Sequence, residues 1–232
     1  MKTLLRGLVA ASLIATPAFA NEPGSDLEKL SYSIGVVLNS QIEPFGELDF
    51  DQLVQGLRDA RDAESQLSDA EIREIIAKAQ ADIRAKQREI AEQRAEQIKI
   101  AGEKYLTENA RREGVTVTAS GLQYEVIEAA DGPMPASTDS VQVNYVGKLF
   151  SGEEFDSSYK RGSAAVFSLD QVIPGWSEGL QLMNVGSKYV FTVPPSLGYG
   201  ESGAGDSQGN EIIPPNSVLV FEVELLAINP ES

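Results

Sequence analysis

Three short stretches of the chain hold side chains whose types and spacing could do chemistry. Glu153, Glu154 and Asp156 are closely spaced carboxylates of the kind that glycoside hydrolysis uses. GYGESG at 198–203 has the G-x-G-x-x-G spacing of a phosphate-binding loop, and GAGDSQGN at 203–210 has the composition of a calcium loop. The chain has no cysteine and no histidine, so its chemistry has to work without a thiol or an imidazole.

The surroundings of these stretches argue against each of those activities. GYGESG is followed by small polar residues and then by two prolines, so no helix follows that could present its N-terminus to a phosphate. Calcium loops of this composition work as repeated arrays, whereas this one occurs once. Three acids in one loop usually form a solvated surface. We therefore predict no nucleotide, no metal and no other cofactor.

A fourth stretch, VIPGWSEGLQLM at 172–183, contains the single tryptophan of the chain. Trp176 follows a Pro-Gly pair and shares one helical face with Leu180 and Met183, which predicts a short helix that begins after Pro174 and stops by Gly186. An antiparallel sheet of about five strands with one short helix must bury its apolar face on that helix. Trp176 is therefore expected between the helix and the sheet.

The strands of that sheet are predicted from Val115 onward. There LQYEVIE, SVQVNYVGKLF, KYVFTV and VLVFEVELLAI alternate apolar with polar residues and are bounded by Gly, Pro, Asp and Ser. The residues before Val115 have helical periodicity instead. The predicted fold class is α+β: an all-helical N-terminal segment, a long connecting helix, and a C-terminal antiparallel sheet wrapped on one short helix.

Two short amphipathic helices are predicted between residues 25 and 67. They are separated by the breaker EPFGELD, and Ser25 or Asp26 and Asp49 are placed to cap them. A module of about 40 residues rarely folds alone without a metal, a disulfide or a partner chain. With no cysteine or histidine present, we predict a homodimer through these helices. The alternative is that they pack on the C-terminal domain of their own chain.

One long helix is predicted to follow. Ser68 and Glu71 have the spacing of a capping box, and Gly114 can end the helix. Its apolar stripe is interrupted in the middle, as in a stalk that touches other parts of the protein only at its ends, and it would measure about 70 Å. The polar gaps argue against a sustained coiled coil. The predicted segments are a signal peptide, a helical dimerisation segment, the long helix and a sheet domain, at 1–20, 21–67, 68–114 and 115–232.

The first twenty residues have the features of a cleavable signal peptide. Lys2 and Arg6 precede an apolar run that is too short to span a bilayer, and AFA ends the segment with small residues. Cleavage after Ala20 would leave no cysteine for a lipid anchor, and no later apolar run is long enough for a membrane helix. We expect export to the periplasm, with outer-membrane association left open. The formal net charge of −16 argues against nucleic acid or an anionic membrane as the main partner.

Three longer stretches of the C-terminal half resemble one known family. They are VQVNYVGKLFSGEEFDSSYKRG, FSLDQVIPGWSEGLQLMNVGSKYVFTVPPSLGYG and IIPPNSVLVFEVELL. These residues are similar to the FKBP family of peptidyl-prolyl cis-trans isomerases, over a nearly continuous match from about residue 120 to 228. The helical segment placed before them resembles the branch of that family that comprises FkpA and the macrophage infectivity potentiators.

The resemblance implies a peptide-binding cleft with assigned roles. Trp176 would form its floor, and the backbone N–H of Ile173 and the hydroxyl of Tyr199 would each donate to a substrate carbonyl. Asp156 would orient the carbonyl region together with Tyr145 and Arg161. The implied cleft residues are Tyr145, Phe155, Asp156, Arg161, Phe167, Val172, Ile173, Trp176, Tyr199, Ile212 and Phe221. Taken singly, each aromatic would be explained by core packing, and only their joint placement favours a site.

Such a cleft can catalyse prolyl isomerisation without a nucleophile or a metal. The barrier of about 18–20 kcal/mol is the amide resonance that is lost as the C–N bond twists. The planar amide is more polar than the twisted one, so an aromatic cleft destabilises the ground state, and fixed hydrogen bonds can hold the twisted carbonyl. A chain without cysteine and histidine suits this mechanism.

Two departures from the family pattern concern the rim of the cleft. Ala165 stands where single-domain members often have an aromatic residue, which would widen one side and argues against tight binding of macrolide inhibitors. The loop ESGAGDSQGNE at 201–211 is longer than in small members, and we expect a mobile flap over the site.

Two functions are compatible with these features. The favoured one is a peptidyl-prolyl cis-trans isomerase that acts on unfolded or partly folded exported proteins, where slow X-Pro bonds limit folding, combined with chaperone activity. The alternative is a non-catalytic dimeric holdase that binds clients by avidity.

Overall fold

The protein is described from a computed structural model that covers residues 23–230. The predicted signal peptide lies outside the described residues. The chain divides into two compact units, one ending at Ala85 and the other beginning at Lys86. Within residues 23–230, no helix is long and apolar enough to cross a membrane.

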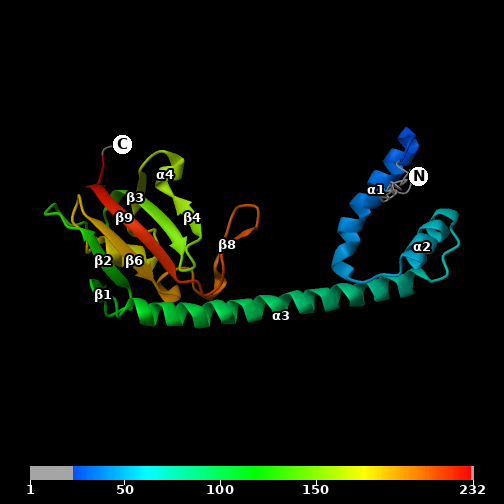
Figure 1. The fold of residues 1–232 in the computed structure, drawn as a ribbon, viewed down its shortest axis with the longest axis horizontal. Helices are drawn as coiled ribbons and strands as arrows, with labels where there is room; N and C mark the ends of the chain where they lie inside the picture. Colours follow the sequence, from blue (N-terminus) through cyan, green and yellow to red (C-terminus); the bar gives the residue numbers. More distant parts are fainter. Residues whose placement is uncertain (1–22, 231–232) are drawn as a thin grey trace, which may run out of the picture. The chain divides into compact units, whose positions relative to one another are not determined.

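The N-terminal unit is helical, as predicted. It contains α1 (Asp26–Ile42), the 3-10 turn η1 (Glu43–Phe45), α2 (Phe50–Asp62) and the first part of α3 (Asp69–Asn109) (Figure 1). η1 occupies the predicted breaker, where Pro44 interrupts helical hydrogen bonding.

The predicted helix starts are confirmed by their capping bonds. Ser25 and Glu28 form a reciprocal capping box at the start of α1, and Asp49 accepts the backbone N–H of Gln52 at 3.1 Å. At the start of α3, the backbone N–H of Ser68 donates to the Glu71 carboxylate at 2.9 Å, and the Ser68 hydroxyl accepts the Glu71 N–H at 3.3 Å. Each cap satisfies backbone donors that have no partner inside the helix.

The apolar stripes of α1 and α2 remain uncovered in the single chain. Neither helix contains a buried residue. Leu27 is 72% exposed and Phe50 is 59% exposed, and most of the apolar residues that follow them along each stripe are also exposed, with Leu53 partly buried. Contiguous exposed apolar surface of this kind usually marks an interaction site.

Helix α3 ends at Asn109, earlier than the predicted stop at Gly114. Its 41 residues correspond to about 60 Å rather than about 70 Å. The Asn109 side chain is buried and donates to the side chains of Gln123 and Thr192 at 2.9 and 3.3 Å. The chain then turns through Gly114, which has a φ of +85°. Tertiary hydrogen bonds therefore end the helix one turn before the glycine.

The C-terminal unit is built on one antiparallel sheet. Its strand order is β1-β2-β6-β9-β3-β4, and β5 also pairs with β3. The strands are β1 (Val115–Val117), β2 (Gln123–Glu128), β3 (Ser140–Leu149), β4 (Glu154–Ser157), β5 (Ala165–Ser168), β6 (Lys188–Val193) and β9 (Leu219–Ile228). Seven strands are present where about five were expected. The strands without a counterpart among the four predicted stretches are β1, β4 and β5, which have three or four residues each, too few for an alternating pattern to be recognised.

The short predicted helix is α5 (Pro174–Leu180), and it packs against the sheet. Trp176 is 4% exposed, and Leu180 and Met183 are fully buried in the same core. Gly179 permits the close approach, because a Cβ there would lie 2.8 Å from the ring of Phe191 on β6. The predicted position of Trp176 between helix and sheet is confirmed.

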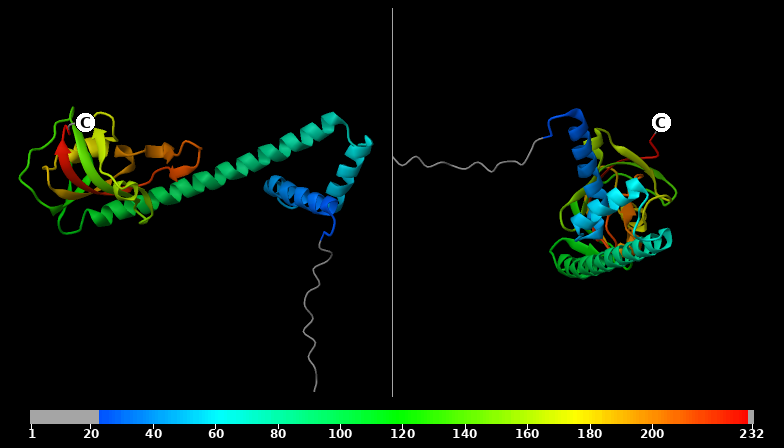
Figure 2. Two further views of the ribbon diagram at one scale, coloured as in Figure 1. Left: turned by 90° about the horizontal axis from the view of Figure 1, so that it is seen from above. Right: turned by 90° about the vertical axis from the view of Figure 1, so that its right-hand side faces the viewer.

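The segment between β6 and β9 leaves the main sheet. It runs through η2 (Pro195–Leu197) and η3 (Gly200–Ser202) to the hairpin β7 (Ala204–Gly205) and β8 (Glu211–Ile213). Figures 1 and 2 both show this hairpin beside the part of α3 that belongs to the C-terminal unit. A one-turn helix, α4 (Ser158–Arg161), follows β4.

Candidate active site

An aromatic cleft of about 290 Å³ opens on the C-terminal unit. Its wall is formed by β3, β4, β5 and β9, by the loop that enters α5, by α5 itself, and by Tyr199, which directly precedes η3. The residues that line it are Tyr145, Phe155, Asp156, Phe167, Gln171, Val172, Ile173, Trp176, Tyr199 and Phe221. A concave, mostly apolar site with a few polar groups is typical of small-ligand and peptide binding.

The indole of Trp176 is held by three surrounding rings. Its ring centroid lies 5.1 Å from that of Tyr145, 5.3 Å from Phe167 and 5.2 Å from Phe221, with interplanar angles of 88°, 84° and 81°. Edge-to-face contacts of this kind are favourable and define the ring orientation. Pro174 in the first turn of α5 places the indole directly behind the extended residue Ile173.

A glycine on β3 lets a further ring, that of Phe155, meet Phe221 in the cleft. A Cβ at Gly147 would lie 2.8 Å from Phe221 and 2.9 Å from Phe155. Those two rings are in edge-to-face contact, with centroids 5.6 Å apart. The absence of a side chain at Gly147 therefore allows this part of the aromatic wall to close.

The hydrogen-bond donors of the cleft that have no partner among the described residues include the buried indole N–H of Trp176, the backbone N–H of Ile173 and the hydroxyl of Tyr199. Tyr199 is 40% exposed, and burial, followed by the charge of Asp156, raises the pKa of its hydroxyl. The Tyr199 hydroxyl is therefore protonated at neutral pH and, like the Ile173 N–H, is free to donate to a bound molecule.

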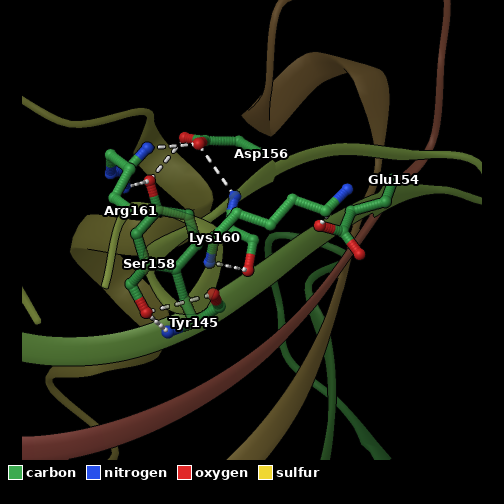
Figure 3. Close-up of polar contacts among 7 residues, drawn as sticks. Tyr145, Glu154, Asp156, Ser158, Lys160 and Arg161 are labelled. Atoms are coloured by element: carbon green, nitrogen blue, oxygen red, sulfur yellow. Dashed lines mark hydrogen bonds and ion pairs between the residues drawn. The ribbon is translucent and has the colours of Figure 1, made fainter. Parts of the chain in front are cut away.

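One wall of the cleft carries a charged network of Tyr145, Asp156 and Arg161 (Figure 3). The Tyr145 hydroxyl donates to Asp156 Oδ2 at 2.5 Å and accepts from Arg161 Nη2 at 2.6 Å. Arg161 Nη1 also pairs with Asp156 Oδ1, and the guanidinium lies over the Tyr145 ring, 5.3 Å from its centroid. The carboxylate is thus fixed in position, with its charge balanced from outside the cleft.

The network also determines the protonation of Tyr145. Burial raises the pKa of Tyr145 to about 12, and the hydrogen bond to Asp156 acts in the same direction while Arg161 opposes it. The hydroxyl therefore remains a donor over the whole physiological range. The backbone N–H of Tyr145 donates to the buried hydroxyl of Ser158 at 2.9 Å, which joins β3 to α4 behind the network.

Comparison with known proteins identifies this architecture. Residues 132–226 match the model of the FKBP-type peptidyl-prolyl cis-trans isomerases, and residues 27–126 match that of the domain amino-terminal to them. A probable FKBP-type peptidyl-prolyl cis-trans isomerase of Haemophilus influenzae is 38% identical over 100% of this chain and 97% of its own length. The chain belongs to the FKBP-type peptidyl-prolyl cis-trans isomerases.

Two further relatives resemble this FKBP chain in its helical N-terminal part as well as in its sheet. The outer membrane protein MIP of Legionella longbeachae is 37% identical, over 88% of this chain and 86% of its own length. The crystal structure of FkpA from Escherichia coli matches with a TM-score of 0.73 and 39% identity, over 89% of this chain and 98% of that one. The likeness covers the helical N-terminal part as well as the FKBP sheet, as the sequence resemblance implied.

The structure brings all but two of the predicted site residues to the wall of the FKBP cleft. Arg161 lies behind the wall and acts on it through Tyr145 and Asp156. Ile212 lies on β8 and is 42% exposed, whereas its neighbour Ile213 is buried in the core. Period-two alternation puts adjacent strand residues on opposite faces, so only one of the two isoleucines can face inward. The catalytic roles of the predicted residues stay predictions.

Gln171 lines the FKBP cleft and was missed by sequence reasoning. It directly precedes Val172 and Ile173 in the loop that enters α5. Its position next to those two residues in the sequence was the signal that could have identified it as a cleft residue. An amide at this position offers both a donor and an acceptor to a bound peptide.

The other sequence stretches with apparent chemistry have structural roles. Glu154 pairs with Lys160 at 3.0 Å (Figure 3). GYGESG leads through η3 into the β7–β8 hairpin. Asp206 accepts the backbone N–H groups of Gln208 and Asn210 at 2.8 Å each and thereby closes the hairpin tip.

A larger cavity, of about 480 Å³, lies in the N-terminal unit between α2 and the start of α3. Its lining is mainly glutamine, serine and small residues, and the Asp59 carboxylate there accepts from Gln55 and Gln66 at 2.6 and 2.9 Å. No aromatic side chain lines it. It lacks the ring surfaces of the FKBP cleft, so we assign the chemistry to the smaller cleft.

Proposed function

We propose that this FKBP isomerase catalyses cis–trans isomerisation of X-Pro bonds in unfolded or partly folded exported proteins, as a homodimer and with chaperone activity. The observation that supports the catalytic part most directly is the cleft itself. An aromatic floor and walls surround two unpartnered donors, Ile173 N–H and the Tyr199 hydroxyl. No acid, base or metal is needed for rotation about a bond that stays intact.

In this mechanism the proline ring enters the cleft over Trp176, and its amide leaves water. Loss of hydration raises the free energy of the planar, more polar amide more than that of the twisted one. Ile173 N–H and Tyr199 O–H donate to peptide carbonyls on either side of the twisting bond. Each 1.4 kcal/mol by which these contacts favour the twisted amide raises the rate about tenfold.

In this proposal Asp156 acts on the carbonyl of the residue before proline, which belongs to the rotating bond. The network with Tyr145 and Arg161 holds its carboxylate at the cleft wall, where it orients the carbonyl dipole as the bond rotates. Preorganised groups of this kind lose little reorganisation energy during the reaction. The residues named as catalytic are thus Asp156, Ile173 and Tyr199, and the remaining cleft residues bind the peptide.

Dimerisation through the N-terminal helices is supported by their uncovered apolar stripes. Leu30 and Val37 on α1 are 58% and 59% exposed, and Val54 and Leu57 on α2 are 42% and 56% exposed. The match to the domain amino-terminal to FKBP isomerases covers these helices. Burying them against a second copy would give the segment the core that it lacks on its own.

Two further parts of the proposal concern location and segment boundaries. We place the protein in the periplasm, on the basis of the signal-peptide pattern in residues 1–20. We assign dimerisation to 21–67, connection to 68–114 and catalysis to 115–232. Macrolide inhibitors are proposed to bind weakly, because Ala165 leaves one side of the cleft without an aromatic ring.

The deciding experiment is an isomerisation assay on purified residues 21–232. Cis–trans exchange of a proline tetrapeptide is measured by NMR or by a protease-coupled assay, with and without the protein. We expect exchange to be much faster with the protein than without it, since spontaneous exchange takes about tens to hundreds of seconds. Exchange that stays at the spontaneous rate would rule out the enzyme and leave only the alternative, a non-catalytic holdase.

A further inference from the structure

The part of α3 that follows Lys86 contacts the sheet domain at positions far apart in the sequence. Arg94 Nη1 pairs with Glu211 Oε1 at 2.8 Å, across 117 positions of the chain. Two turns later, Gly102 faces Val218, since a Cβ at the glycine would lie 3.0 Å from the valine. At the helix end, Asn109 is bonded to Gln123 and Thr192. These contacts all lie within the C-terminal unit.

Glu211 belongs to a segment, here called the flap, that comprises residues 200–217. The flap follows Tyr199 and contains the β7–β8 hairpin, in which Ala204 pairs with Ile213 and Gly205 with Glu211. Figures 1 and 2 show it standing away from the main sheet beside α3.

Internal hydrogen bonds make the flap stiff. Its tip is closed by Asp206, as described above. Its root is closed by the backbone bond from Asn216 N–H to the Gly200 carbonyl at 2.9 Å and by the Ser217 hydroxyl, which donates to the Pro214 carbonyl at 2.7 Å. A stiff hairpin moves as one body, so a force applied at Glu211 is transmitted to the root beside Tyr199.

The flap is only partly packed against α3. A cavity of about 230 Å³ lies between α3, η2 and the end of the flap, and its lining includes Lys99, Glu103, Pro195, Ser196 and Asn216. Within the described residues 86–230, the Arg94–Glu211 pair is the only ion pair or side-chain hydrogen bond between α3 and the flap. The outer end of the flap therefore contacts the helix through a single ion pair, and a cavity lies beside the root of the flap.

We propose that Arg94 is a positioning residue of the isomerase: through Glu211 it holds the flap, and with it Tyr199, in the arrangement that accepts a proline peptide. This inference rests on the isomerase function proposed above. Without the pair, the flap samples additional positions, and the fraction of molecules ready to bind falls. Apparent affinity falls by the same fraction, whereas turnover of the bound peptide is unchanged once the flap has closed.

The expected effect is modest because the pair is accessible to solvent. The side chains of Arg94 and Glu211 are 61% and 44% exposed. Exposed ion pairs shift a conformational equilibrium by about two- to fivefold at most. High salt screens them, since the Debye length falls to about 3 Å at 1 M.

The experiment compares KM and kcat for a proline tetrapeptide, in low salt and in about 1 M NaCl. The variants are Arg94→Ala, the charge-exchanged double variant Arg94→Glu with Glu211→Arg, and the matched control Arg88→Ala. Arg88 lies on another face of α3 and has no ion pair among the described residues. Tryptophan fluorescence from Trp176 gives peptide affinity independently.

We expect Arg94→Ala to raise KM about two- to fivefold at unchanged kcat, and the charge exchange to restore KM. Salt should raise KM of the wild type more than that of Arg94→Ala. Arg88→Ala should behave as the wild type. Equal KM values in all variants at both salt concentrations would overturn the proposal while leaving the isomerase function intact.

Hydrogen exchange tests the role of Arg94 without any isomerase turnover, so its result does not depend on the proposed function. The backbone N–H of Asp206 bonds to the Asn210 carbonyl at 2.9 Å inside the flap, and Asn216 N–H bonds to Gly200 at its root. Hydrogen exchange of the Asn216 N–H at the root should accelerate in Arg94→Ala and stay unchanged in Arg88→Ala, whereas the Asp206 N–H inside the stiff hairpin should exchange equally in both variants. Identical exchange of the Asn216 N–H in both variants would contradict the tie between helix and flap, whether or not the protein isomerises proline.

Discussion

The polar groups of the cleft differ in whether they have hydrogen-bond partners within the protein. Asp156 is surrounded by donors, from Tyr145, Arg161 and the backbone N–H of Ser157. Tyr199 and the Ile173 N–H, by contrast, have no partner among the described residues. Donors that face a cleft without a partner are available to a ligand that supplies an acceptor.

Removing either of two side chains should slow catalysis. We expect Tyr199→Phe and Asp156→Ala each to lower kcat/KM for a proline peptide by about tenfold, because the first removes a hydrogen bond to a peptide carbonyl and the second removes the charge that orients the carbonyl dipole. The control is Tyr159→Phe, since Tyr159 is 54% exposed on α4 and does not line the cleft. Unchanged rates in both cleft variants, measured by NMR exchange, would reject the assigned roles.

The raised pKa of Tyr145 determines how the isomerase rate and the stability of the protein depend on alkaline pH. Because the pKa of Tyr145 is raised from 10.0 to about 12, we expect no loss of isomerase rate from its ionisation up to about pH 10. Between about 10 and 12 the unfolded chain releases the tyrosine proton while the folded chain retains it. Unfolding is then favoured, so stability falls as pH rises through this window.

Urea unfolding of the wild type and of Tyr145→Phe between about pH 8 and 12 measures this effect. The variant lacks the ionisable group, so its loss of stability above pH 10.0 should be shallower. Identical slopes for the two proteins would show that burial of Tyr145 does not control the alkaline transition.

At the scale of elements, the contact between α5 and β6 holds the floor of the cleft. Gly179→Ala would place a methyl group 2.8 Å from the ring of Phe191, which is fully buried. We expect a loss of about 1–3 kcal/mol in the free energy of unfolding, because the core has no space for the added atom. Urea denaturation is the measurement.

Ser177→Ala provides the control on the same helix. Its hydroxyl has no hydrogen-bond partner among the described residues, and the substitution adds no atoms. It should change stability by less than about 0.5 kcal/mol. A Gly179→Ala protein as stable as this control would mean that α5 can move away from β6 at little cost.

At the scale of the whole molecule, the proposed homodimer depends on the exposed stripes of α1 and α2. Leu30→Glu with Val37→Glu should convert the dimer into monomers, because two charges would have to be buried in the interface. Analytical ultracentrifugation of residues 21–232 measures this. Lys29→Glu, a polar position outside the apolar stripe of α1, is the control and should remain dimeric.

The same monomeric variant separates catalysis from chaperoning. We expect its isomerase rate on a tetrapeptide to be unchanged, because the cleft residues all lie within the C-terminal unit. Suppression of aggregation of an unfolded client should fall, since two clefts on one dimer bind a long chain by avidity. Equal suppression by monomer and dimer would contradict a role for the N-terminal helices in chaperoning.

Local interactions were sufficient to predict much of this protein. Caps at Ser25, Asp49 and Ser68 use bonds that span three residues, and the alternation along β3 reflects the geometry of a single strand. The aromatic wall followed from the family resemblance, because its residues occur in contiguous motifs. Such features depend on neighbours in the sequence, so they can be recognised without a fold.

Other features were decided only by tertiary structure. The end of α3 at Asn109 depends on partners at Gln123 and Thr192, and the tie between Arg94 and Glu211 joins residues 117 positions apart. Strands of three or four residues form because a longer neighbour offers them hydrogen bonds. In each case the stabilising partner is remote in sequence and is brought near only when the sheet has formed, so no local pattern could have revealed it.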